Sequence, residues 1–222
     1  MRRFLADNSL SLFFFAILIA ALVGQAVAGH GAHNEEAVQH GSPEISLGRY
    51  VLSSEFGQAM LENWESEYLQ FSLFFLATIW FVQRGSPESK EEPGPESDKD
   101  AKVGRYAPET GPRWAKVGGW RTALYLYSLL IVTTFIFLAA WAGQSVTGWT
   151  AYNRDQQEHG SAAVSWLEYV QRPRFWEETF QNWQSEFLAV GSIAIFAVYL
   201  RARGASESKP VGTPHETTGA SN

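Results

Sequence analysis

Two segments of the chain carry the same polar pattern inside otherwise apolar sequence. Spacings of three, four and seven residues place these polar side chains on one face of a helix. They are Asn63, Ser66, Glu67 and Gln70 in the first segment, and Asn182, Ser185 and Glu186 in the second. Two facing carboxylates inside a membrane could bind a proton, a cation or a small polar solute. Glu67 and Glu186 are therefore the centre of the candidate polar site.

Two glutamines, Gln25 and Gln144, extend this site. Gln25 lies four residues from the end of the apolar run 10–29, which is about 6 Å deep at the helical rise, and Glu67 lies about 4–5 Å below Trp64. We therefore expect Gln25 level with Glu67, and Gln144 level with Glu186. We favour a purely structural role over a binding site, because a shallow glutamate reaches interfacial water and amides join helices by hydrogen bonds.

These residues recur because the chain contains two copies of one segment. Residues 9–90 return as 128–209 without a gap, at an offset of 119 positions. A fixed offset is typical of a duplicated structural unit. The matching motifs are Gly24-Gln25 and Gly143-Gln144, His40-Gly41-Ser42 and His159-Gly160-Ser161, Asn63-Trp64-x-Ser66-Glu67 and Asn182-Trp183-x-Ser185-Glu186, and Arg84-Gly85-x-x-Glu88-Ser89-Lys90 and Arg203-Gly204-x-x-Glu207-Ser208-Lys209.

The apolar runs predict an all-α membrane protein with four transmembrane helices. The expected spans are about 10–29 and 64–83 in the first repeat, 9–90, and about 122–143 and 183–202 in the second, 120–209. The two shorter runs reach full length only if each begins at its tryptophan. The expected interface anchors are Trp64, Trp183, Arg84 and Arg203. Residues 91–119 predict a flexible cytoplasmic linker and 210–222 a disordered tail, because both are polar and rich in Pro, Gly and Ser.

The distribution of Lys and Arg predicts the orientation. Segment 84–121 carries eight of them, whereas the first outer loop carries only Arg49. Both termini are then cytoplasmic, and the two tandem hairpins are parallel repeats related by a pseudo-twofold axis along the membrane normal. Arg2-Arg3 and Ala26-Val27-Ala28 imitate a signal peptide. We expect no cleavage, because this helix has a counterpart in the middle of the chain.

The outer loops predict short interfacial helices followed by helix starts. Ser53 is a candidate N-cap and Pro173 a first helical residue, so the helices are expected to begin near Ser54 and Pro173. His40-Gly41 and His159-Gly160 predict a shared turn. Gly24 and Gly143 are expected to allow close helix packing.

Other chemistries find little support. His30, His33 and His40 form a loose set of metal ligands, but the second copy keeps only His159, so we predict no metal site and no cofactor. The chain has no cysteine and therefore no disulfide or thiolate site. The net charge of −6, without a basic face, does not indicate nucleic-acid binding. Phosphate-binding and nucleophile motifs are missing, which disfavours an enzyme.

The inner-end motif Arg-Gly-x-x-Glu-Ser-Lys predicts a helix ending. Phosphate binding or partner docking is the alternative, because clustered basic groups near the inner leaflet can meet anionic lipid. Together with the doubled Asn-Trp-x-Ser-Glu, it resembles an uncharacterised family of bacterial integral membrane proteins, catalogued as a domain of unknown function. The resemblance covers both repeats. It implies the four-helix fold and a bacterial inner membrane, and it supplies no activity or catalytic residue.

The sequence therefore predicts a non-enzymatic, multi-pass protein of the inner membrane whose outer loops engage a partner or stabilise the envelope. The expected partners are the lipid bilayer and a second copy of this chain or another membrane protein. The alternative is a small proton, cation or solute transporter or channel that uses Glu67 and Glu186. A membrane enzyme acting at the outer interface is the third hypothesis.

Overall fold

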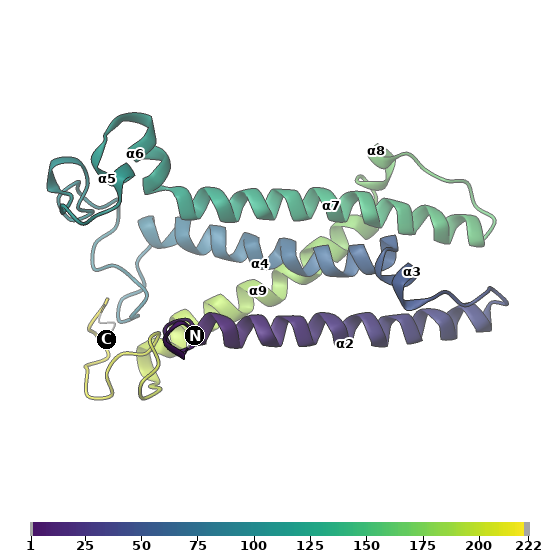
Figure 1. The fold of residues 1–222 in the computed structure, drawn as a ribbon, viewed down its shortest axis with the longest axis horizontal. Helices are drawn as coiled ribbons and strands as arrows, with labels where there is room; N and C mark the ends of the chain where they lie inside the picture. The colour runs from purple at the N-terminus through teal and green to yellow at the C-terminus, as the bar shows by residue number, and fades with distance from the viewer. Residues whose placement is uncertain (1, 220–222) are drawn as a thin grey trace. The chain divides into compact units, whose positions relative to one another are not determined.

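The computed structural model describes residues 2–219, which form helices, turns and loops and contain no strand. The predicted all-α class is therefore confirmed. Figure 1 shows four long helices: α2 (Ser9–Gln39), α4 (Ser54–Trp80), α7 (Ser128–Glu158) and α9 (Pro173–Tyr199). The bounds of α2 and α7 differ by the same 119 positions as the two sequence copies, and so do those of α4 and α9.

Helices α4 and α9 begin where the sequence predicts. The Ser53 hydroxyl accepts a hydrogen bond from the Phe56 amide at 3.2 Å, which satisfies one of the unpaired N–H groups of the first turn. Pro173 opens α9, where its missing N–H costs no helical hydrogen bond. Both helices end three residues before the predicted spans do, at Trp80 and Tyr199.

Helices α2 and α7 extend well beyond the predicted spans. Each apolar run continues as a polar helix to Gln39 or Glu158, so the expectation that the loops begin near His30 and Gln144 is corrected. The helices stop at the predicted His-Gly turns. Gly41 and Gly160 have φ of 69° and 70°, and the next amide in each copy bonds back to the carbonyl of Ala37 or Gln156 at 2.7 Å.

Short helices follow these turns: α3 (Leu47–Val51) and α8 (Trp166–Tyr169). Helix α1 (Arg2–Asp7) precedes α2. The predicted linker contains a 3-10 turn at Gly104–Tyr106, α5 (Arg113–Lys116) and the start of α6 (Gly119–Leu126). Tyr127 separates α6 from α7, so a break between helices lies within the predicted third span, 122–143.

The region around the end of the linker packs on two tryptophan side chains, although its composition is mostly polar. The rings of Trp114 and Trp120 meet edge to face at 6.4 Å. The hydroxyl of Thr122 donates to the carbonyl of Trp114 at 2.6 Å, and Ala115 is buried. Residues 114–122 therefore pack on one another, and the flexibility predicted for 91–119 stays a prediction.

The chain divides into two compact units. The first contains 1–61 and 144–169, and the second contains 62–143 and 170–222. Buried residues of the first unit include Tyr50, Phe56 and Tyr169. Those of the second include Phe137, Ala140 and Phe175. Each unit also buries polar side chains, which is where the candidate sites lie.

Within the described residues, α2 and α7 are long and apolar enough to cross a membrane. The most apolar stretch of α2 is almost entirely exposed, and that of α7 is about one-fifth buried. The core helix of a water-soluble protein would be mostly buried. A Cβ atom at Gly24 would meet nothing within 4 Å in the described part of the chain, so the predicted role of Gly24 in close packing stays a prediction.

Candidate functional site

The predicted polar stripe of α4 does not coincide with its buried face. Asn63 and Glu67 are exposed, whereas Ser66 is 2 % exposed. The Ser66 hydroxyl donates to the carbonyl of Asn63 at 3.0 Å. In the second copy, Ser185 makes the same bond to the Asn182 carbonyl at 2.8 Å. Both serines therefore bind their own helix.

The two predicted glutamates lie near each other in the second unit. Glu67 and Glu186 are close enough for their charges to interact, and Glu186 is partly buried. Gln25 and Gln144 belong to the first unit, so their predicted alignment with the glutamates stays a prediction. Gln144 is 1 % exposed, and neither of its amide atoms has a hydrogen-bond partner in the described part of the chain.

A third carboxylate, Glu65, is the most buried acid of the second unit. It is fully buried, and its two oxygens accept from the indole N–H of Trp183 at 3.1 and 3.0 Å. Trp183 is therefore a partner of Glu65 rather than only the interface anchor that the sequence predicts. The charged group that acts on Glu65 is Glu62, which is also negative. The buried face of α4 runs through Glu65, Leu69 and Ser72.

Aromatic rings surround this indole. Trp141 of α7 lies 6.4 Å from Trp183 and stacks on Phe175 at 6.2 Å. Phe180 meets Trp183 edge to face at 5.5 Å. Two polar atoms in the cluster are buried without a described partner: the indole nitrogen of Trp141 and the hydroxyl of Thr179, which is 0 % exposed. The arrangement can hold a proton on a carboxyl group that is shielded from water.

Glu65 is absent from the predicted site, because that prediction relies on residues shared by the two copies. The corresponding residue of the second copy is Gln184, so the position is variable in the repeated motif. The other anchors differ in environment. Trp64 is 38 % exposed, and Arg84 is largely exposed at 3.9 Å from Glu216. Arg203 is also exposed.

A second candidate site is formed by the outer turns, which we define as residues 40–53 and 159–172. An asparagine in each preceding helix binds both backbone groups of one loop residue. Asn34 binds the N–H and C=O of Ile45 at 2.9 and 3.0 Å. Asn153 binds those of Val164 at 2.8 and 2.9 Å. We call this pair of bonds the amide clamp.

The aromatic side chain one turn before each asparagine reinforces the clamp. The imidazole of His30 contacts the Ile45 carbonyl at 2.7 Å, and the indole of Trp149 donates to the Val164 carbonyl at 2.8 Å. Trp149 thus replaces His30 in its structural role. The three N-terminal histidines have separate partners, since His33 bonds Glu55 at 2.7 Å and His40 the Glu36 carbonyl at 2.9 Å. Within residues 2–219, no three His, Cys, Asp or Glu residues form a metal-binding group.

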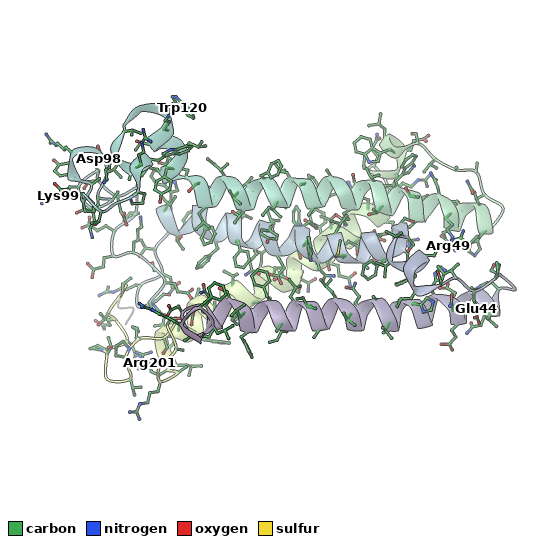
Figure 2. All side chains as sticks on the ribbon, viewed as in Figure 1. Glu44, Arg49, Asp98, Lys99, Trp120 and Arg201 are labelled. Atoms are coloured by element: carbon green, nitrogen blue, oxygen red, sulfur yellow. The ribbon has the colours of Figure 1, made fainter. Side chains whose placement is uncertain are left out.

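A buried tyrosine of each outer turn packs against a glycine of the preceding helix. Tyr50 and Tyr169 are 5 % and 1 % exposed, and their hydroxyls lie over Gly29 and Gly148, where a Cβ atom would collide with them. Burial, followed by the charge of Glu55, raises the pKa of Tyr50. The surface remains apolar around this frame: Leu52 is 89 % and Leu167 62 % exposed. Figure 2 labels Glu44 and Arg49 on the first of these turns.

The repeated inner motif forms the same turn after α4 and α9. Ser89 accepts from the Gln83 amide and Ser208 from the Ala202 amide, both at 2.9 Å. Gly85 and Gly204 have φ of 85° and 87°, a region that favours glycine. These bonds explain the motif as a helix ending, as predicted.

The motif lysine of the second copy holds the C-terminal segment. The Lys209 ammonium is 1 % exposed and donates to four carbonyls, those of Gly85, Pro214, His215 and Thr217, at 2.6 to 3.3 Å. We call this arrangement the lysine clasp. Burial, followed by the charge of Arg201, lowers the pKa of Lys209. Residues 210–219 are therefore bonded to the helix ends in the structure, and the disorder that the sequence predicts for the tail stays a prediction.

The motif glutamates also meet at this end of the second unit. Burial, followed by the charge of Glu207, raises the pKa of Glu88. The Ser206 hydroxyl bonds Glu207 at 2.7 Å and lowers its pKa. Arg201, labelled in Figure 2, donates to the Thr213 carbonyl of the tail at 3.0 Å. The inner turns thus form a connected polar structure.

Comparison with known proteins identifies a family. A family model described as a domain of unknown function (DUF6766) matches residues 1–220. No curated protein and no solved structure matches the chain.

Proposed function

This chain belongs to the DUF6766 family, and we propose that it is a non-enzymatic, multi-pass protein of the bacterial inner membrane that engages a partner through its outer turns. The amide clamp carries this proposal. It fixes both turns in one conformation before any partner arrives, which lowers the entropy cost of binding. Leu52 and Leu167 supply exposed apolar contact area beside the clamped residues.

The proposed topology has four spans in two parallel hairpins. Helices α4 and α9 each have 27 residues, and at about 1.5 Å per residue both exceed the hydrocarbon thickness of about 30 Å. Their polar first turns would lie above the outer interface. The Lys/Arg distribution supports cytoplasmic termini and a pseudo-twofold axis along the membrane normal.

Cysteine labelling tests this topology. A cysteine replacing Lys99 should resist a membrane-impermeant reagent in intact cells, whereas a cysteine replacing Gln157 should react. Labelling in permeabilised cells shows that both thiols are reactive. The reverse pattern in intact cells would overturn the orientation.

Photo-crosslinking tests the engagement of a partner. A photoreactive amino acid at Leu52 or Leu167 should give protein adducts in native membranes. A second copy of this chain would add 24.8 kDa, and another membrane protein would add a different mass. Phe13 of α2 is the matched control, because it is 60 % exposed but predicted to face lipid. Adducts no more abundant at the two leucines than at Phe13 would contradict the proposal.

Transport of a proton, cation or small polar solute is the second candidate function. What favours it is that Glu67 and Glu186 both belong to the second unit and that the charge of Glu67 acts on Glu186. Proton and cation flux into liposomes would be compared between the wild type and Glu67→Gln/Glu186→Gln. Flux that requires both carboxylates supports transport, whereas flux that is absent or unchanged by the substitutions excludes this mechanism.

A further inference from the structure

Neither function proposed above uses the fully buried carboxylate of Glu65. Both of its oxygens share the one N–H of Trp183. Within residues 2–219, no basic side chain forms an ion pair with it, and Glu62, the charge that acts on it, is also negative. A buried charge of this kind costs several kcal/mol unless it is paired, so it is rarely kept without a function.

The indole of Trp183 is the hydrogen-bond partner of the carboxylate. An ionised carboxylate only accepts hydrogen bonds, and the Trp183 indole supplies a donor to both oxygens. A protonated carboxyl accepts this bond through one oxygen only, because the other then carries the O–H.

Aromatic rings pack around the indole that binds this carboxyl. Phe175, Thr179 and Trp183 follow one another at intervals of four residues, and both Phe175 and Trp183 contact Trp141. Thr179 lies on α9 between these two aromatic residues and is 0 % exposed, so this face of α9 is shielded from water. A proton needs no cavity, so a closely packed site of this kind suits it better than a solute.

We propose that Glu65 is a proton-binding site, at which uptake of one proton changes the hydrogen bonding between α4 and α9. The proton adds to one carboxylate oxygen and forms an O–H bond, so that this oxygen no longer carries charge. The other oxygen keeps the indole of Trp183. This inference goes beyond partner engagement and differs from transport by Glu67 and Glu186.

Three further carboxylates lie on the two helices near this site. Glu62 and Glu67 flank Glu65 on α4, and Glu186 lies one turn beyond Trp183 on α9. Glu67 is exposed and Glu186 partly exposed, so both are hydrated. Their titration must be distinguished from that of Glu65, and infrared spectroscopy does this because a shielded carboxyl has a different C=O stretching frequency from a hydrated one.

The test uses the full chain in lipid nanodiscs and records infrared difference spectra between acidic and alkaline pH. We expect the C=O band of a water-shielded carboxyl at acidic pH. It should be lost in Glu65→Gln and kept in both Glu67→Gln and Glu186→Gln. Trp183→Phe should move the frequency of the band, because it removes the hydrogen-bond donor to the carboxyl.

Each result decides the matter. A shielded band that survives Glu65→Gln, or the absence of such a band in the wild type at every pH, overturns the proposal. A frequency unchanged in Trp183→Phe overturns it as well. If Glu65→Gln fails to fold, as judged by circular dichroism, Glu65→Asp takes its place. The shorter carboxyl should then shift the band, and an unshifted band would contradict the assignment.

Discussion

Asn153 binds both backbone groups of Val164, its Oδ1 accepting from the N–H at 2.8 Å and its Nδ2 donating to the C=O at 2.9 Å. Asn34 does the same to Ile45 in the other copy. One amide side chain thus completes the backbone hydrogen bonding of a loop residue, as a neighbouring strand would. This relationship gives the first prediction.

Asn153→Ala should loosen the second outer turn. The substitution leaves the partly buried N–H of Val164 unpaired, while its C=O keeps the bond from the Trp149 indole. The unpaired N–H costs about 1–3 kcal/mol and speeds exchange of the Val164 amide hydrogen about 5- to 150-fold. Hydrogen-exchange mass spectrometry of 159–172 measures the effect. Gln157→Ala, an exposed change on the same helix, should leave exchange unaltered. Equal rates in the two variants would refute the clamp.

Gly148→Ala should destabilise the protein and Gly24→Ala should stabilise it. The new Cβ at position 148 collides with the buried Tyr169 hydroxyl, at a cost of about 1–3 kcal/mol. At position 24 it meets nothing, and alanine gains about 0.5–1 kcal/mol over glycine within a helix. Thermal unfolding in detergent compares the two variants. Tyr169→Phe should relieve part of the first defect, and a change of the same sign at both glycines would contradict this reading.

Protonation of His159 should stabilise the end of α7. Its ring nitrogen lies 2.9 Å from the Asp155 carbonyl and 3.4 Å from the Asp155 carboxylate, and these partners raise the pKa of His159. A raised folded pKa means that the contribution is complete below the unfolded value of about 6.5 and is lost as pH rises through the folded value. NMR titration should show the raised pKa, and Asp155→Asn should lower it. An identical titration in that variant would exclude the ion pair.

Lys209→Met should release the C-terminal segment, whereas Lys90→Met should not. Lys209 donates to four carbonyls, so its loss costs about 1.5–3 kcal/mol locally. Lys90, its counterpart in the first copy, makes a single 3.4 Å bond to the Gly94 carbonyl and a 3.9 Å ion pair with Glu96. Limited proteolysis should cut 210–219 faster only in the Lys209 variant. Equal cutting of the two variants would argue against the clasp.

Local signals predicted much of this fold. Ser53 and Pro173 located two helix starts, and the His-Gly pairs located two helix ends. The polar ends of α2 and α7 escaped prediction, because helix continues through any residues that tolerate it until a terminating turn intervenes. Hydropathy marks where an apolar run ends, which is a different property from where a helix ends.

The candidate site was predicted less well. Helical spacing permits a face through Asn63 and Glu67 as readily as one through Glu65 and Leu69, and packing against α9 decides between them. Agreement between the copies also directed attention to shared residues. Glu65 faces Gln184 in that comparison, so its asymmetry concealed a contact that only one copy makes.

The lysine clasp has a practical consequence for chemical labelling. Lys99, Lys102 and Lys116 are exposed and should react with an amine reagent at ordinary rates, whereas the amine of Lys209 is reachable only after the tail has opened. Its labelling rate then reports the opening equilibrium of the C-terminal segment without any engineered probe. Opening of the C-terminal segment can therefore be followed in the wild-type protein through the native Lys209 amine.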